Sequence, residues 1–399
     1  MPNNKSSKHY TLQDHEFMAR AIQLAKNGTY TTSPNPNVGC IIVKNNKIIS
    51  EGWHKKAGSG HAEVNALADV SVEDSIGATA YVTLEPCSHY GRTPPCALRL
   101  IEAKVATVFV AMLDPNPQVA GNGVAILKRA GIEVHVGLLE ADARALNHGF
   151  FSRMEKNKPF VRVKLASSLD GKTALSNGES KWITGPFARA DVQKYRAASC
   201  AILTTAQTVL VDNARLNVRE EQLEFMYPYS DVVTQIRQPI KVVLDGHNRI
   251  KRSTIDALDL FNIDLDPNNL DTPGIVIIKS NTGLSEFQKE FEDRGDIRII
   301  GANYDQQSGF DIDQVLAICS SLQINNLWVE AGGKLASSFI VSNQFDELIV
   351  YVAPKLMGLG GMDLVPFGPL ENMSQTKSLN LLDCRVVGED IRLTYSPKV

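Results

Sequence analysis

The chain has 399 residues, of which 43% are hydrophobic and 21% charged, and its formal net charge is −3. This length predicts two domains, with room for a third, and the composition is ordinary for a soluble globular protein. The charge lacks the basic excess of a phosphate-backbone binder, so we expect no nucleic-acid partner. No apolar run approaches the length of a membrane span, and the polar start MPNNKSSKHY lacks the apolar core of a signal peptide. Six cysteines are too few for a disulfide scaffold, which favours a reducing cytoplasm.

The first part of the chain alternates helix and strand signals. Helical spacing of apolar residues marks the helices, and short β-rich runs mark the strands. Such alternation predicts a mainly parallel sheet that is covered on both faces. In chain order we expect a helix over 12–27, a hairpin over 38–53 that turns at Asn45-Asn46, a short helix from His61, a strand over 79–84, a helix from Cys96, a strand over 107–113, a helix over 124–131 and a strand over 132–137.

A charged, polar stretch over 140–160 interrupts this alternation and indicates a partly helical connector. A second α/β series follows it, so we divide the chain into domains of residues 1–150 and 151–399. The polar segments 219–238 and 251–273 are predicted to be surface excursions without chemistry. The strands expected in the second series lie at 160–166, 201–204, 241–245, 274–278, 296–301, 326–332 and 347–354.

Four residues of the first series combine the ligand types of a zinc site with a free carboxylate. His61 and Glu63 form an H-x-E pair, Cys87 follows Pro86, and Cys96 begins a predicted helix. Zinc favours imidazole and thiolate ligands, and a catalytic zinc keeps three protein ligands and one water. We therefore expect His61, Cys87 and Cys96 to bind one zinc ion, and Glu63 to shuttle the proton of the bound water, as in zinc deaminases.

Two plainer interpretations of these residues stay open. The zinc could be structural, with His89 as a fourth ligand, or the cysteines could be buried and unrelated to any metal. The insert SHYGRTPP makes the cysteine spacing longer than the C-x-x-C of the zinc-deaminase signature. In the catalytic interpretation the water attacks an electron-poor amidine-type ring carbon, because ammonia must leave it. The mixed sulfur and nitrogen ligands favour zinc over iron.

Longer motifs make the comparison with a known family specific. The runs TSPNPNVGCIIV, GWHKKAGSGHAEVNAL, TLEPCSHYGRTPPC and MLDPNPQVAGNG resemble the deaminase half of the bifunctional riboflavin-biosynthesis deaminase/reductase family. The runs KLASSLDGKTA, GESKWIT, LTTAQTVLVDNARLNVR and VEAGGKLASSF are similar to its reductase half. The resemblance extends over nearly the whole chain. It implies an α/β protein with an N-terminal cytidine-deaminase-like three-layer domain and a C-terminal dihydrofolate-reductase-like domain.

The family's activity implies two successive steps on one substrate, a diamino-pyrimidinone that carries a phosphoribosylamino group. A ring amino group is hydrolysed first, and the ribosyl chain is then reduced to ribityl with NADPH. The substrate contacts that the resemblance implies in the deaminase half are Asn35, Arg92, Asp114 and Asn116. For the two asparagines, hydrogen bonding within a turn stays open as an alternative, and for the arginine simple solvation does.

In the reductase half the resemblance implies contacts with NADPH and with the substrate. Lys164 would assist the reduction electrostatically or supply a proton, unless it only points to solvent. Guanidinium forks suit a phosphate dianion, although surface solvation or an ion pair with Asp191 or Glu220 is an alternative for the two arginines. The implied cofactor contacts are Ala166, Trp182, Thr208, Asp212, Gly332, Gly333, Lys334, Leu335, Ala336, Ser337 and Ser338. The implied substrate contacts are Ser180, Arg196, Leu216, Arg219 and Glu330.

Glycine motifs locate the nucleotide. The run GKT at 171–173 is not a P-loop, because position 166 is Ala where the motif requires Gly. In LWVEAGGKLASSFI a strand instead runs into Gly332-Gly333 and a helix starts, and amides at such a helix start bind phosphate. Glycine pairs can also simply end strands. The chain departs from the family at Gly246, where a hydroxyl residue often follows the strand-ending aspartate.

We therefore expect a cytoplasmic homo-oligomeric enzyme with a small phosphorylated pyrimidine as substrate, one zinc ion per chain and NADPH as cofactors, and no membrane partner. One rival hypothesis is a deaminase of bases in RNA or DNA, which an assay on free nucleotide against oligonucleotide would separate. A second rival is a binding module with a structural zinc, for which Glu63→Gln would change nothing measurable. A third is a chain in which only one half is active.

Overall fold

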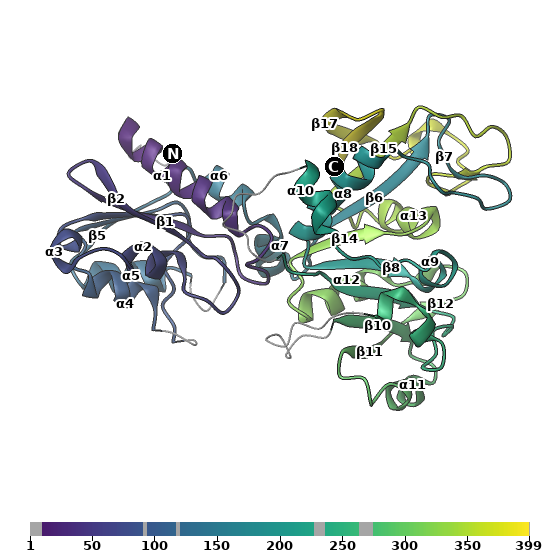
Figure 1. The fold of residues 1–399 in the computed structure, drawn as a ribbon, viewed down its shortest axis with the longest axis horizontal. Helices are drawn as coiled ribbons and strands as arrows, with labels where there is room; N and C mark the ends of the chain where they lie inside the picture. Colours follow the sequence, from purple (N-terminus) through teal and green to yellow (C-terminus); the bar gives the residue numbers. More distant parts are fainter. Residues whose placement is uncertain (1–9, 91–93, 117–119, 227–235, 263–273, 399) are drawn as a thin grey trace. The chain divides into compact units, whose positions relative to one another are not determined.

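The protein is described by a computed structural model in which the chain forms two compact units (Figure 1). The first unit ends at Lys156 and the second begins at Asn157. Among the described residues, no helix is long and apolar enough to cross a membrane. The described residues are 10–90, 94–116, 120–226, 236–262 and 274–398.

The first unit is built on a five-stranded sheet in the order β2-β1-β3-β4-β5. Its hairpin turns at Asn45 and Asn46, both with positive φ (51° and 57°), as the asparagine pair predicts. β1 pairs antiparallel with β2 and β3, whereas β3, β4 and β5 run parallel. The strands β2, β3, β4 and β5 thus share one direction, as a mainly parallel sheet predicts, and β1 alone runs against them, as the expected hairpin requires. The elements are α1 (Leu12–Ala25), a 3₁₀ turn (Lys26–Gly28), β1 (Gly39–Lys44), β2 (Lys47–Trp53), α2 (Ala62–Leu67), α3 (Val72–Ser75), β3 (Thr79–Val82), α4 (Cys96–Glu102), β4 (Thr107–Val110), α5 (Asn122–Arg129), β5 (Glu133–Val136), α6 (Glu140–Ala145) and α7 (His148–Lys156).

Two glycines let helices approach this sheet closely. A Cβ at Gly39 on β1 would lie 2.0 Å from the carbonyl oxygen of Ala21 on α1. A Cβ at Gly52 on β2 would lie 2.3 Å from the backbone nitrogen of Ala66 on α2. Since real Cβ atoms do not approach so closely, both positions require glycine. The second contact fixes α2, the helix that His61 caps, against the sheet.

The stretch expected as a connector is helical but belongs to the core of the first unit. Its helices α6 and α7 bring Ala143, Phe150 and Phe151 into a buried cluster with Met18 of α1. The charged residues of this stretch are exposed or half-buried, which explains why the segment resembles a linker in the sequence.

The second unit holds a nine-stranded sheet in the order β11-β10-β9-β8-β14-β6-β15-β18-β17. Adjacent strands from β11 to β15 are parallel, as expected, and β18 and β17 extend the sheet antiparallel. These last two strands are absent from the sequence prediction. The elements are β6 (Phe160–Ser168), β7 (Lys172–Ala174), α8 (Pro186–Ala198), β8 (Ala201–Thr205), α9 (Ala206–Asp212), α10 (Glu220–Met226), β9 (Ile240–Asp245), 3₁₀ turns (Ile255–Ala257 and Asp259–Phe261), β10 (Ile275–Ser280), α11 (Leu284–Glu290), β11 (Ile297–Ala302), β12 (Tyr304–Asp305), β13 (Gly309–Phe310), α12 (Ile312–Ser321), β14 (Asn326–Glu330), α13 (Gly333–Val341), β15 (Glu347–Ala353), β16 (Met362–Asp363), a 3₁₀ turn (Met373–Gln375), β17 (Leu379–Val387) and β18 (Asp390–Pro397).

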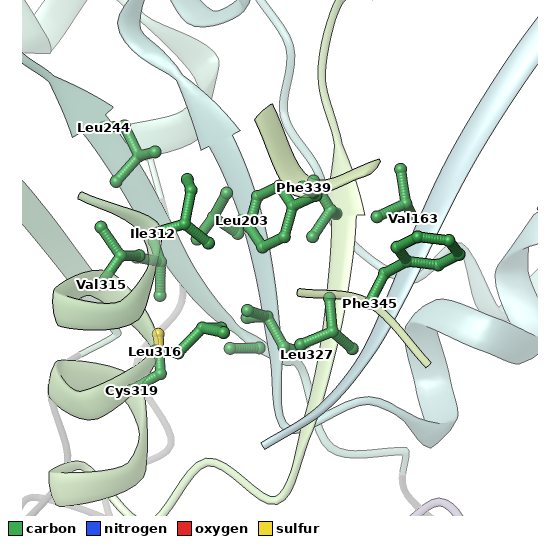
Figure 2. Close-up of a cluster of buried hydrophobic side chains, with 14 of the residues drawn as sticks. Val163, Leu203, Leu244, Ile312, Val315, Leu316, Cys319, Leu327, Phe339 and Phe345 are labelled. Atoms are coloured by element: carbon green, nitrogen blue, oxygen red, sulfur yellow. The ribbon is translucent and has the colours of Figure 1, made fainter. Parts of the chain in front are cut away.

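Both faces of this sheet are covered. On one face α12 and α13 pack against the strands, and Figure 2 shows Val315 and Leu316 of α12 close to Leu203 and Leu327. The helices α8 and α9 cover the other face together with the two 3₁₀ turns over 255–261.

The segments expected as surface excursions take part in the hydrophobic core. Ile255, Leu260 and Phe261 are buried among the strands of the second unit, and Leu223 of α10 is fully buried. Each apolar group stands within a polar stretch, which hides it from a composition-based prediction. The polar composition of 219–238 and 251–273 is therefore a poor guide to burial in the described parts of these segments.

Candidate active sites

The predicted zinc ligands lie together in the first unit. His61 caps α2, Cys87 lies beyond the end of β3, and Cys96 is the first residue of α4. Their ligand atoms all lie within 4.8 Å of one another, and His61 Nδ1 is 3.3 Å from Cys96 Sγ and 3.6 Å from Cys87 Sγ. Tetrahedral bonds to a shared zinc would separate sulfur and nitrogen ligands by about 3.5 Å, so the donor set fits the metal.

The two thiols interact with each other as a pair. The backbone N–H of Cys96 donates to Cys87 Sγ at 3.2 Å. The hydrogen bond from the Cys96 thiol lowers the pKa of Cys87 to about 4, and the same bond raises the pKa of Cys96. Without metal the pair therefore holds one proton, which zinc binding would displace.

Glu63 stands beside this cluster without belonging to it. Its side chain lies in the first turn of α2 and the residue is 3% exposed. Burial raises the pKa of its carboxyl group, and a hydrogen bond with Cys96 counteracts this in part. His89, the alternative fourth ligand, is not in the cluster formed by the described residues. The arrangement offers three ligands, an open position and a neighbouring carboxylate, which is what metal-assisted hydrolysis requires.

A buried histidine connects Asn35 to the metal cluster. The Asn35 amide nitrogen lies 3.1 Å from His54 Nε2, and His54 Nδ1 lies 3.1 Å from the Gly60 carbonyl oxygen. The His54 and His61 rings meet edge to face with their centroids 5.4 Å apart. His54 Nδ1 must donate to the carbonyl, so Nε2 accepts from the Asn35 amide and the ring is neutral. The sequence analysis missed His54, although it lies within a family motif, GWHKKAGSGHAEVNAL.

Of the other residues expected to contact the deaminase substrate, the structure describes Asp114 and Asn116. Asp114 and Asn116 are half-buried, and the Asn116 N–H donates to Asp114 Oδ1 at 2.8 Å. Burial raises the pKa of the Asp114 carboxyl to about 6. Arg92 lies outside the described residues. That these residues contact substrate stays a prediction.

In the second unit, Arg196 and Glu330 form a bidentate ion pair. Arg196 Nε and Nη2 donate to Glu330 Oε1 and Oε2 at 2.6 and 2.7 Å, and Nη1 donates to the Asn217 carbonyl oxygen at 2.8 Å. Trp328 Nε1 also donates to Glu330 Oε1. Lys164 is the register partner of Glu330 on neighbouring β6. The alternative partners Asp191 and Glu220 are not those of Arg196.

The charges of this cluster offset one another. Burial alone would raise the pKa of Glu330, but Arg196 and Lys164 outweigh it and lower the pKa to about 2. Burial lowers the pKa of Lys164, while Glu330 partly restores it. Nearby Arg219 is exposed, whereas Leu216 is buried with φ of 50° and Ser180 is half-buried.

The expected cofactor residues follow strand ends of the second sheet. Gly332 caps α13 without a side-chain acceptor, so the first amides of this helix can donate to a phosphate. A Cβ at Gly333 would lie 2.8 Å from the Leu364 carbonyl oxygen, so packing requires glycine there. Thr208 lies in α9 after β8 and donates its N–H to Thr205 Oγ1 at 3.3 Å.

The remaining residues expected to contact the cofactor differ in exposure and in their hydrogen-bond partners. Trp182 is 61% exposed, and the Arg189 guanidinium lies over its ring at 4.6 Å. Ala166 is on β6, and Asp212 ends α9. Ser337 and Ser338 return their hydroxyls to carbonyl oxygens of α13 itself. The exposed helix start fits a dinucleotide phosphate, but the individual contacts stay predictions.

Comparison with known proteins assigns both units. The family model of the cytidine and deoxycytidylate deaminase zinc-binding region matches residues 11–112, and that of the RibD C-terminal domain matches residues 159–393. Riboflavin biosynthesis protein RibD of Haemophilus influenzae is 44% identical over 396 residues, which cover 98% of this chain and 99% of that protein. The chain belongs to the RibD family.

Other members of the RibD family agree with this assignment. RibD of Escherichia coli strain K12 is 43% identical, with 96% of this chain and 99% of that protein covered. The solved structure of Acinetobacter baumannii RibD, form 2, matches with a TM-score of 0.84 at 41% identity, covering 97% of this chain and 99% of that one. A Thermotoga maritima structure, described as a diaminohydroxyphosphoribosylaminopyrimidine deaminase/5-amino-6-(5-phosphoribosylamino)uracil reductase, matches with a TM-score of 0.76 at 31% identity and covers 97% and 99%.

Membership of the RibD family makes the chain a bifunctional enzyme of riboflavin biosynthesis, with a zinc-dependent deaminase and an NADPH-dependent reductase. It also confirms the expected pair of folds. The departure from the family at Gly246 has a steric explanation. A Cβ there would lie 2.2 Å from the Tyr304 ring, whose hydroxyl is 2.9 Å from His247 Nε2. Tyr304 thus fills the space in which a hydroxyl residue would stand.

Proposed function

We propose that the chain acts twice on one riboflavin precursor. It first deaminates 2,5-diamino-6-(5-phosphoribosylamino)pyrimidin-4(3H)-one and then reduces the ribosyl chain of the resulting 5-amino-6-(5-phosphoribosylamino)uracil to ribityl. We assign the deaminase to the domain expected over residues 1–150, which α7 completes to Lys156 in the structure, and the reductase to the remainder of the domain expected over 151–399. The observation that carries the first activity is the three-ligand cluster beside the buried carboxylate of Glu63.

The deaminase residues divide into metal ligands and a proton shuttle. His61, Cys87 and Cys96 would hold zinc, which supplies a hydroxide at neutral pH when it is bound. Glu63 takes the proton of that water and returns it to the departing ammonia. Asn35, held by buried His54, supports the substrate from the side of His61. In our proposal Arg92, Asp114 and Asn116 complete the substrate contacts.

The reductase residues bind and orient rather than react. When bound by these residues, NADPH would supply the hydride that reduces C1′ of the open-chain or imine ribose, which requires proximity more than a nucleophile. Glu330 and Arg196 orient each other and the substrate, and Lys164 beside them acts electrostatically or as a proton donor. The further residues proposed for substrate are Ser180, Leu216 and Arg219, and those proposed for cofactor are Ala166, Trp182, Thr208, Asp212 and 332–338.

The proposal also covers the oligomeric state, the cellular location and the class of substrate. We propose that the enzyme works in the cytoplasm as a homo-oligomer and uses a small phosphorylated pyrimidine rather than nucleic acid. The near-neutral net charge of −3 supports this choice of substrate. A sedimentation measurement tests the oligomer, and a single-stranded oligonucleotide competitor tests the choice of substrate.

The direct test measures metal content together with both activities. The purified chain is analysed for zinc and assayed for ammonia release and NADPH consumption on the phosphorylated diamino-pyrimidinone. We expect one zinc per chain, ammonia release without NADPH, and NADPH consumption that follows it. Arg196→Ala should impair NADPH consumption and leave ammonia release nearly unchanged. Equal loss of both activities in this variant would contradict the assignment of independent sites.

A further inference from the structure

A second carboxylate lies buried close to the metal cluster. Glu85, two residues before Cys87, is 4% exposed. Its Oε2 accepts the N–H groups of Asp114 and Gly121 at 3.2 and 2.9 Å, and its Oε1 accepts that of Val124 at 3.1 Å. Among the described residues no cation is paired with Glu85, so backbone N–H groups alone stabilise its carboxylate.

Glu85 replaces the missing cap of α5. The N-cap of this helix is Gly121, with φ of 82° and no side chain to accept a hydrogen bond, and Val124 is the third residue of the helix. An N-cap side chain normally accepts the N–H at this position. Here a carboxylate from the end of another strand accepts it, and its charge also suits the positive end of the helix.

Close packing accompanies this hydrogen bonding. A Cβ at Gly123 in the first turn of α5 would lie 2.0 Å from the carbonyl oxygen of Pro86. The start of α5 therefore presses directly on the residue between Glu85 and Cys87. This contact holds the start of α5 against the backbone beside Cys87 independently of the Glu85 side chain.

The same carboxylate oxygen holds one proposed substrate residue, Asp114, and a point of the chain beyond the other, Asn116. Asp114 and Gly121 both donate to Oε2, and Asp114 in turn accepts the N–H of Asn116. We propose that Glu85 is a positioning residue of the deaminase, which fixes Asp114 and Asn116 at a set distance from Cys87 and thereby shapes the substrate pocket. This inference rests on the proposed function, and Glu85 itself touches neither metal nor substrate.

The test is Glu85→Gln, which keeps the shape of the side chain but turns an NH₂ group toward backbone N–H donors. We expect KM for the phosphorylated pyrimidine in ammonia release to rise by about tenfold or more, because small misplacements of binding groups have effects of this size. The kcat should change by less than about threefold, the zinc content should stay at one per chain, and NADPH reduction of supplied deaminated substrate should be unchanged. In hydrogen exchange, amides of a peptide over 120–127 should exchange faster than in the wild type.

The matched control is Thr11→Ala, which removes the side-chain cap of α1 in the same unit. It should leave KM unchanged, which separates a positioning effect from general loss of a helix cap. Glu85→Asp keeps the carboxylate but shortens the side chain by one methylene group, so it should give a KM between those of the wild type and Glu85→Gln. It also tests the proposal if Glu85→Gln does not fold. An unchanged KM in a folded Glu85 variant, or loss of zinc in it, would overturn the proposal. Absence of ammonia release in the wild type would instead overturn the proposed function.

Discussion

The two sites of this enzyme differ in how they neutralise buried charge. The proposed deaminase site gathers two thiols, an imidazole and the Glu63 carboxylate, and its balancing positive charge would come from a zinc ion. The proposed reductase site balances itself, because Arg196 and Lys164 stand against Glu330. The first site should therefore respond to metal removal, and the second to loss of one partner of an internal ion pair.

The largest expected effect is on the first site alone. Cys87→Ala removes one of three ligands, so we expect zinc to be lost and ammonia release to fall by more than about a thousandfold, since the hydroxide depends on the metal. NADPH consumption on supplied deaminated substrate should stay within twofold. Metal analysis and the two assays check this. If NADPH consumption fell in parallel, the contrast between the sites would fail.

The second site should lose stability when its ion pair is broken. Glu330→Gln leaves the Arg196 charge without its counter-ion at a site where each side chain is 12% exposed, so we expect a loss of about 3 kcal/mol in unfolding free energy. The control is Asp313→Asn, which breaks the exposed pair with Lys158 in the same unit and should cost less than about 1 kcal/mol. Urea denaturation measures both, and equal losses would contradict the distinction.

A smaller effect is expected at Gly246, which follows the end of β9. Gly246→Ser should cost about 1–3 kcal/mol, because its Cβ would lie 2.2 Å from the Tyr304 ring. In a Tyr304→Ala background the same serine should cost almost nothing, since the obstructing ring is gone. Thermal unfolding of the single and double variants tests this coupling. Additive costs would mean that Tyr304 is not the obstacle.

The last expected effect is a pH dependence at the Arg196–Glu330 ion pair. The pKa of Glu330 is lowered to about 2, below the roughly 4.3 of an unfolded glutamate. The ionised carboxylate therefore stabilises the fold fully above about pH 5, and this contribution is lost as the pH falls toward 2. The difference in unfolding free energy between wild type and Glu330→Gln should shrink over that interval. A difference that stays constant would show that the ion pair does not lower this pKa.

The two sites differ in how far the sequence could predict them, because their residues are spaced differently along the chain. The zinc ligands and Glu63 fall within residues 61–96, in motifs whose spacing carries their chemistry, and the structure brings the ligands together. In the reductase, Arg196 and Glu330 lie 134 positions apart and meet only through the sheet, so their mutual pairing was not predicted. Glu85 escaped notice for a related reason, because its partners are backbone N–H groups, which no sequence motif marks.

The fold also divides into elements that local sequence patterns predict and elements that depend on distant partners. The parallel strands β6, β8, β9, β10, β11, β14 and β15 were predictable because each is a short run rich in apolar and β-branched residues, whereas the shorter β7, β12 and β13 were not predicted. The edge strand β17 was missed, since its sequence LNLLDCRVV is mostly exposed and lacks such a run. The buried Ile255, Leu260 and Phe261 were missed because they lie in short apolar groups between polar residues. Local patterns thus predicted the central elements and failed where burial depends on distant partners.

The most direct test of two separate sites is Glu63→Gln measured in both assays on one preparation. We expect a folded chain with one zinc, ammonia release reduced by about 10³-fold or more, as expected when a general acid–base group is lost, and NADPH consumption on supplied deaminated substrate at the wild-type rate. Ammonia release at the wild-type rate from this variant would contradict the role assigned to Glu63 and with it the proposed deaminase mechanism.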